Sequence, residues 1–222
     1  MRASPSSPPT AGPWPALWQL LAGTLLLTAT ASTLAADAPD PAATAAAVRV
    51  AVTVCGACHG PAGNSQQPKF PRLAAQRASY LSAQLKAFRS QSRGDPDAIG
   101  YMWGMASELD DTMVEALASY YSTQAATASG RGADAALIAR GREIYERGVP
   151  DQGVPQCAAC HGPDARGLED FPRLAGQHAQ YILKQLASFQ SNMRNVATMH
   201  GVAQNLRVPE MRAVAAFLNS LP

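Results

Sequence analysis

The sequence has little net charge. Its 18 lysines and arginines are nearly balanced by 16 aspartates and glutamates, which leaves a formal charge of +2. A nucleic-acid-binding protein would need a basic patch or stripe, so this balance argues against that class. Long apolar runs are scarce as well. After one short run near the N-terminus, no segment approaches a membrane-spanning length, and we expect the rest to be a soluble exported protein.

The N-terminal segment has the order of a secretory signal peptide. Arg2 precedes a polar stretch, then an apolar core at Ala16–Leu27, and finally an exit of small residues. This apolar core is too short for a comfortable membrane span. We expect a signal peptide over residues 1–36, cleaved between Ala35 and Ala38. An uncleaved anchor is the alternative.

Two long segments repeat about a hundred residues apart. FPRLAAQRASYLSAQLKAFRSQSR at Phe70–Arg93 matches FPRLAGQHAQYILKQLASFQSNMR at Phe171–Arg194 with 13 of 24 residues identical. This period is too long for a solenoid repeat, so it indicates duplication of a whole small domain. A small, polar segment without apolar periodicity lies between the copies and is expected to be a linker. The expected division is an N-terminal domain at 37–124, a linker at 125–134 and a C-terminal domain at 135–222.

Both halves are expected to be helical. Apolar residues spaced i, i+4 and i+7 mark one face of an amphipathic helix. They are Leu81, Leu85 and Phe88 in the first half, and Ile182, Leu186 and Phe189 in the second. Further helices are expected at about Ala42–Val54 and Ala135–Arg147. No alternating run suggests a sheet, so the predicted fold class is all-α.

The last helix of each half has a recognisable start. Asp110 or Asp111 is a plausible N-cap in the first half, and Pro209 suits the first turn in the second. Each half then has about 90 residues, with many alanines and glycines and few large apolar side chains. A domain of that size is marginal on its own hydrophobic core. We therefore expect a bound group to complete each core.

All four cysteines lie in two Cys-x-x-Cys-His motifs. The motifs are Cys55, Cys58 and His59, and Cys157, Cys160 and His161. A zinc site needs four ligands, and each cluster offers three. A disulfide or redox pair has no use for the histidine that follows. Cysteines at i and i+3 lie on one side of a helical turn and can bond two haem vinyl groups, while the histidine reaches the iron. The spacing favours two covalent haem c groups.

The repeat suggests which residue takes the sixth iron position, opposite the histidine. Aligned on the last helix of each half, MWGMASELDD and MHGVAQNLRV place Met102 opposite Met199. Met105 lies opposite Val202 and so has no twin. We therefore expect Met102 and Met199 to be the sixth ligands. Four extra residues in the first half leave Met105 as the alternative there.

Two other histidines are expected to have no part in ligation. His200 lies opposite Trp103, which cannot bind iron. His178 lies opposite Arg77, and we expect it on a solvated helix face.

These motifs in combination resemble the dihaem cytochrome c4 family. The resemblance includes the two Cys-x-x-Cys-His motifs, the two FPRLA(A/G)Q segments and the two Met-x-Gly-x-Ala turns, and it spans nearly the whole mature chain. It implies two class I cytochrome c domains related by a pseudo-twofold axis. It also implies a periplasmic one-electron carrier, often loosely membrane-associated, that passes electrons towards a terminal oxidase. We expect a monomer whose partners are redox proteins such as a respiratory complex.

Residues around the haems receive supporting roles. An axial histidine is oriented by a hydrogen bond to its second nitrogen, and the carbonyls of Pro71 and Pro172 are the candidates, as in related cytochromes. The alternative is that these prolines only turn the chain. Haem propionates favour arginine and neutral donors. The candidates are Arg72, Arg173, Gln76, Gln177, Tyr80 and Tyr181, with a solvated helix start as the alternative reading.

A competing function is a dihaem enzyme, either a peroxidase or a sulfur-compound oxidoreductase. Such an enzyme needs one haem with an open or labile site and a nearby base or nucleophile. Both halves offer a methionine in the same place, and the haems use every cysteine. We therefore expect an electron-transfer protein and not an enzyme.

Overall fold

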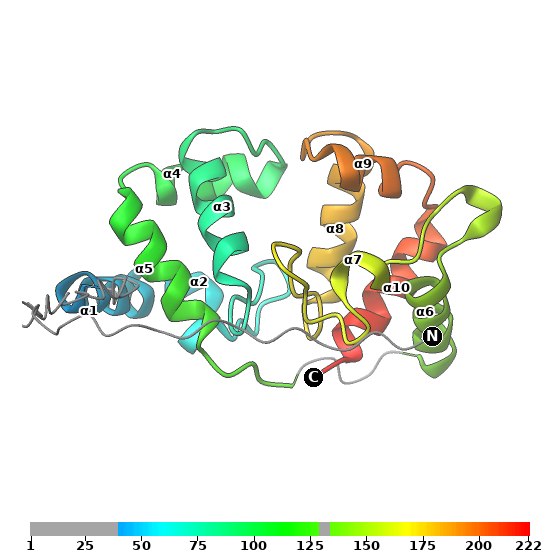
Figure 1. Ribbon diagram of the computed structural model, residues 1–222, viewed down its shortest axis with the longest axis horizontal. Coiled ribbons are helices and arrows are strands. Elements are labelled where there is room, and N and C mark those ends of the chain that lie inside the picture. Colours follow the sequence, from blue (N-terminus) through cyan, green and yellow to red (C-terminus); the bar gives the residue numbers. More distant parts are fainter. Residues whose placement is uncertain (1–39, 129–133) are drawn as a thin grey trace, which may run out of the picture. The chain divides into compact units, whose positions relative to one another are not determined.

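The computed structural model describes residues 40–128 and 134–222 (Figure 1). The expected signal peptide and its cleavage site lie outside the described residues, as does part of the expected linker. Ala38–Pro222 form one compact unit. Within the described ranges the secondary structure is helical and contains no strand, only an isolated bridge between Val149 and Val154. The all-α prediction is confirmed.

The first half begins with one uninterrupted helical run. Helix α1 (Pro41–Val50) continues through a π-helical turn, η1 (Ala51–Cys55), into α2 (Gly56–His59). Asp40 caps α1, since its carboxylate accepts a hydrogen bond from the Ala42 N–H at 3.0 Å. The expected helix at 42–54 therefore extends into the first Cys-x-x-Cys-His motif.

This run corrects one expectation. Pro41–His59 has 19 residues and a mean hydropathy of 1.5, so by length and composition alone it is a helix that could cross a membrane. The expectation that no segment after the N-terminal run approaches a membrane-spanning length is therefore wrong for this helix, because α1 continues through the first cysteine motif. Ala47 and Ala51 of the run are buried against Leu117 and Tyr121 of helix α5 (Asp111–Ser122).

The remaining elements of the first half frame its core. They are η2 (Pro61–Gly63), α3 (Ala78–Arg89), η3 (Ala98–Met102), α4 (Trp103–Ala106) and α5. The predicted stripe of α3 faces inward, since Leu81 and Phe88 are buried. Asp110 is the N-cap of α5, because its carboxylate accepts from the Met113 N–H at 2.7 Å. α3 and α5 lie side by side in Figure 1.

The second half repeats this plan. Its elements are α6 (Ala135–Arg147), η4 (Pro150–Gln152), α7 (Ala158–His161), α8 (Ala179–Gln190), α9 (Ala197–Ala203) and α10 (Val208–Ser220). α6 has the predicted bounds, and Pro209 lies in the first turn of α10 as predicted. Gly148, at φ +74°, ends α6 and starts a loop before the second cysteine motif. The first half has no such interruption before its own motif.

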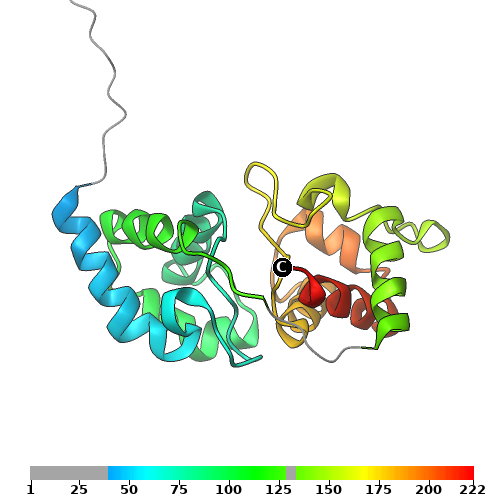
Figure 2. The same ribbon diagram turned by 90° about the horizontal axis from the view of Figure 1, so that it is seen from below.

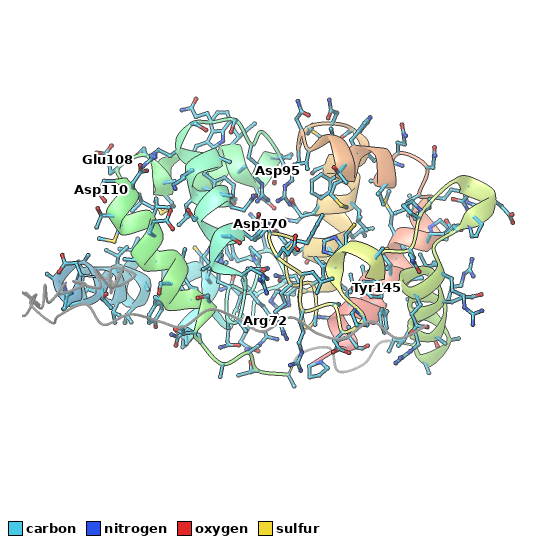
Figure 3. All side chains as sticks on the ribbon, viewed as in Figure 1. Arg72, Asp95, Glu108, Asp110, Tyr145 and Asp170 are labelled. Carbon is cyan, nitrogen blue, oxygen red and sulfur yellow. The ribbon has the colours of Figure 1, made fainter. Side chains whose placement is uncertain are left out.

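Helices α6 and α10 cross at close range (Figure 2). Gly141 makes the approach possible, because a Cβ atom there would lie 2.0 Å from the carbonyl oxygen of Ala213. Beside it, Tyr145 of α6 (labelled in Figure 3) is fully buried and its ring centroid lies 5.5 Å from that of Phe217. The Tyr145 hydroxyl donates to the Gly162 carbonyl at 2.5 Å, which ties α6 to the turn after the second motif.

Candidate haem sites

Each motif histidine is buried at the end of a short helix and fixed by one nitrogen. His59 Nδ1 lies 2.8 Å from the Pro71 carbonyl oxygen, and His161 Nδ1 lies 3.0 Å from that of Pro172. A carbonyl only accepts, so Nδ1 carries the proton and donates, and Nε2 is left with the lone pair that a metal needs. Burial lowers the pKa of both histidines, and the proline carbonyls offset this only in part. Both rings are therefore held neutral, which is the ligating form.

An aromatic ring stands edge-on to each histidine. The Phe70 and His59 ring centroids are 6.3 Å apart, and those of Phe171 and His161 are 6.1 Å apart. Each phenylalanine directly precedes the proline whose carbonyl holds the histidine. The repeated Phe-Pro-Arg-Leu segment therefore orients the imidazole on two sides.

The first cysteine of each motif has the character of a partly buried structural group. All four are free of disulfide bonds, and Cys55 and Cys157 pack against the apolar cores of their halves. Burial raises the pKa of Cys55, and it raises the pKa of Cys157 to about 11. A reactive redox thiol has a lowered pKa, so these environments do not favour the disulfide-exchange alternative.

The methionines differ in burial. Met102 closes η3 and packs against a small cluster formed by Phe88, Ala98 and Ala106. Met199 in α9 packs against the core of the second half. Met105, the alternative in the first half, is 58% exposed.

The two remaining histidines are both accounted for by hydrogen bonds. His200 turns towards α8, and its Nδ1 lies 2.8 Å from the Phe189 carbonyl oxygen. His178 was expected on a solvated helix face, and this prediction was wrong. It is 9% exposed and precedes α8 as its N-cap residue, with Nε2 3.0 Å from the Ser65 carbonyl oxygen in the first half. The start of α8 is covered by the other copy of the domain, a contact that a single domain does not reveal.

Gln76 and Gln177 join the two halves. Gln76 donates to the Arg173 carbonyl at 2.9 Å and accepts from the Arg173 N–H at 2.8 Å. Gln177 makes the same two bonds with the backbone of Arg72, at 3.0 and 2.9 Å. The glutamine amides are thus committed to the other half's main chain. Both glutamines are buried, so the alternative of a solvated helix start is wrong for these two residues.

The arginines of the Phe-Pro-Arg-Leu segments have protein partners. The Arg72 guanidinium (Figure 3) is buried and donates to Asn64, Thr127 and the Gly176 carbonyl. Arg173 donates to the Pro222 carbonyl at 2.6 Å. Sequence reasoning missed a second pair of buried arginines, Arg93 and Arg194, which contact Tyr80 and Tyr181. Their identity in both copies of the repeat was the available signal.

Two helical domains, each with a buried histidine directly after a Cys-x-x-Cys pair, define a c-type cytochrome with two haem centres. A family model described as cytochrome c matches residues 44–124 and again 138–222. Two cytochrome c domains, each with its cysteine pair and histidine, imply two covalently bound haem c groups.

The sequence matches to similar proteins cover most of the chain. Cytochrome c-552 of Acidithiobacillus ferridurans is 40% identical over 206 residues, covering 91% of this chain and 86% of the relative. Cytochrome c4 of Stutzerimonas stutzeri is 39% identical over 181 residues, covering 77% and 85%. The solved structure of Acidithiobacillus ferrooxidans cytochrome c4 is 41% identical, with a TM-score of 0.72, and covers 75% of this chain and 98% of that one. The chain belongs to the dihaem cytochrome c4 family and is an electron-transfer protein with redox-protein partners.

Proposed function

We propose that both haems are six-coordinate and bound in the same way. The thioethers come from Cys55, Cys58, Cys157 and Cys160, and the axial pairs are His59 with Met102 and His161 with Met199. The free Nε2 of each buried histidine supports this assignment. The partial burial of Met102 against the Phe88 cluster supports it over exposed Met105.

The proposed role is one-electron transfer between respiratory-chain components in the periplasm, ending at a terminal oxidase. The observation that carries it is the buried, neutral, singly hydrogen-bonded histidine present in both halves. Histidine–methionine ligation raises the haem potential, which suits a carrier late in a respiratory chain. When bound, each haem supplies a one-electron redox centre. The chain's own residues exclude water and hold the ligands in place.

A sulfur-oxidation chain is the second candidate for the electron source. The thiosulfate dehydrogenase electron acceptor of Thiomonas intermedia is 38% identical over 191 residues, covering 82% of this chain and 84% of that protein. The same carrier architecture would serve this role without any change in either haem site. The two candidates differ in the donor protein and not in the chemistry of this chain.

The visible absorption spectrum of the exported protein, oxidised and reduced and with carbon monoxide, tests the proposal. We expect two c-type haems per chain, a methionine–ferric band and no response to carbon monoxide. A haem that bound carbon monoxide readily would have an open site and would contradict the six-coordinate carrier. Stopped-flow mixing with thiosulfate dehydrogenase or with a terminal oxidase would then distinguish the partners.

A further inference from the structure

Two buried arginines meet where the halves join. Arg93 follows α3 and Arg194 follows α8, at matching positions in the sequence repeat. Each guanidinium lies over a phenylalanine of its own half, 4.7 Å from the Phe88 centroid for Arg93 and 4.6 Å from the Phe189 centroid for Arg194. Two like charges are thus buried close together.

Neutral acceptors from both halves hold this pair. Gln84 Oε1 accepts from both arginines at 2.7 Å, and Gln185 Oε1 accepts from Arg93 at 2.9 Å and from Arg194 at 2.6 Å. Each arginine also donates to the tyrosine hydroxyl of the opposite half. These bonds join Arg93 to Tyr181 at 3.3 Å and Arg194 to Tyr80 at 2.8 Å. Up to this point the cluster follows the twofold repeat.

The symmetry breaks at the Nε atoms. Arg93 Nε donates to Asp95 Oδ2 at 2.7 Å, and Asp95 (labelled in Figure 3) is 1% exposed. In the second half, the residue two positions after Arg194 is Val196, which has no carboxylate and is 42% exposed. Arg194 is 5% exposed, and among the described residues its Nε is the one buried side-chain nitrogen or oxygen without a hydrogen-bond partner.

The cluster holds two guanidinium groups and one carboxylate. Burial raises the pKa of Asp95, but Arg93, the Gln185 amide and Arg194 together outweigh this and hold that pKa below its usual value, so Asp95 is ionised. One positive charge is left over, and the contact of Asp95 is with Arg93. Nearby Lys184 and Asp97 pair with each other and contribute no net charge. A buried charge with an unsatisfied donor is costly, so the site calls for an anion.

We propose that Arg194 Nε donates to the carboxylate of a haem propionate, and that Asp95 fills the equivalent place on Arg93. Guanidinium and carboxylate form strong, directional, charge-assisted hydrogen bonds. The two haems are then inequivalent, since one propionate is paired with Arg194 while Asp95 occupies the Nε atom of Arg93. The proposal rests on the two haem c groups and not on the methionine ligands proposed above.

The test uses the haem-loaded chain with ¹³C-labelled haem carboxylates. For Arg194→Gln we expect the labelled carboxylate band to move in redox-difference infrared spectra, and one of the two midpoint potentials to fall because a positive charge beside that haem is lost. Arg194→Lys keeps the charge and is expected to lower that potential less. An unchanged labelled band in Arg194→Gln would overturn the proposal.

Gln84→Met is the matched control. It removes an acceptor at the Nη2 atom of Arg194 and leaves Nε untouched, so the labelled band is expected to stay in place. An equal band shift in this variant would assign the effect to loosening of the cluster and overturn the proposal. A crystal structure of the haem-loaded protein should show a propionate oxygen on Arg194 Nε, and a water alone at that atom would contradict it. The methionine–ferric band, recorded on the same samples, separates these outcomes from failure of the proposed axial ligands.

Discussion

Gln76 and Gln177 make reciprocal hydrogen bonds between the two halves. Gln76 binds the main-chain N–H and carbonyl of Arg173, and Gln177 binds the main-chain N–H and carbonyl of Arg72. All four bonds lie between 2.8 and 3.0 Å. Duplication of this segment therefore created the contact between the two halves, because the same segment supplies both the glutamine amide and the backbone that the amide binds.

We expect Gln177→Ala to lower the free energy of unfolding by about 1–3 kcal/mol, since it leaves the buried backbone N–H and carbonyl of Arg72 without partners. Denaturant unfolding of the haem-loaded protein measures this. Gln66→Ala is the control, because exposed Gln66 makes only a local bond to the Asn64 carbonyl. Equal midpoints for the two variants would show that the contact contributes little.

Met102→Ala is expected to abolish the methionine–ferric band of one haem and to open that haem to carbon monoxide. Met105→Ala should leave both haems closed, because the Met105 side chain is mostly exposed. Absorption spectra of the two oxidised variants decide between them. If Met105→Ala alone lost the band, the assignment in the first half would be wrong.

We expect the protein to become less stable as the pH falls, because His178 is buried in its neutral form. Burial lowers the pKa of His178, and the Ser65 carbonyl offsets this only in part. The unfolded chain therefore binds a proton first as the pH falls. The stability from neutral His178 is complete above the unfolded pKa of about 6.5 and is lost progressively towards the lower folded pKa.

The difference in unfolding free energy between wild type and His178→Gln, measured from pH 8 to pH 5, isolates this contribution. The other histidines are common to both proteins and cancel in the comparison. We expect the wild type to lose stability more steeply below pH 6.5. Parallel curves would indicate that His178 has the same pKa in the folded and unfolded chains.

Gly141→Ala is expected to destabilise the second half by about 3 kcal/mol or more, because the new methyl group would overlap the Ala213 backbone and force α6 from α10. Thermal unfolding followed by haem absorbance would show the loss. Arg140→Ala, one residue earlier on the exposed face of α6, should change stability by no more than about 0.5 kcal/mol. Similar melting for both variants would contradict the tight crossing.

The elements that depend on local pattern could be predicted from sequence. The stripe of α3, the bounds of α6 and the Asp110 cap follow from spacing and capping chemistry that act within a few residues. The histidine partners Pro71 and Pro172 were expected from the resemblance to related cytochromes, and their carbonyls do contact the histidines.

The sequence could not predict which surfaces of the two copies are buried against each other. His178 and the Arg93–Asp95 pair are buried by residues that lie far away along the chain. A repeat shows that two domains exist, but it does not show which faces meet. Helical periodicity also failed to show that α1 continues into the cysteine motif without a break.

The hydrogen bonds of Gln76 and Gln177 to the backbone of the other half have an evolutionary consequence. A side chain that binds only main-chain atoms places no demand on the identity of the side chain opposite. After the gene segment duplicated, other residues of the two copies were therefore free to diverge, as the segments after Arg93 and Arg194 have done, without loss of this contact between the copies. Two initially equal redox centres could in this way drift apart in function while remaining parts of one molecule.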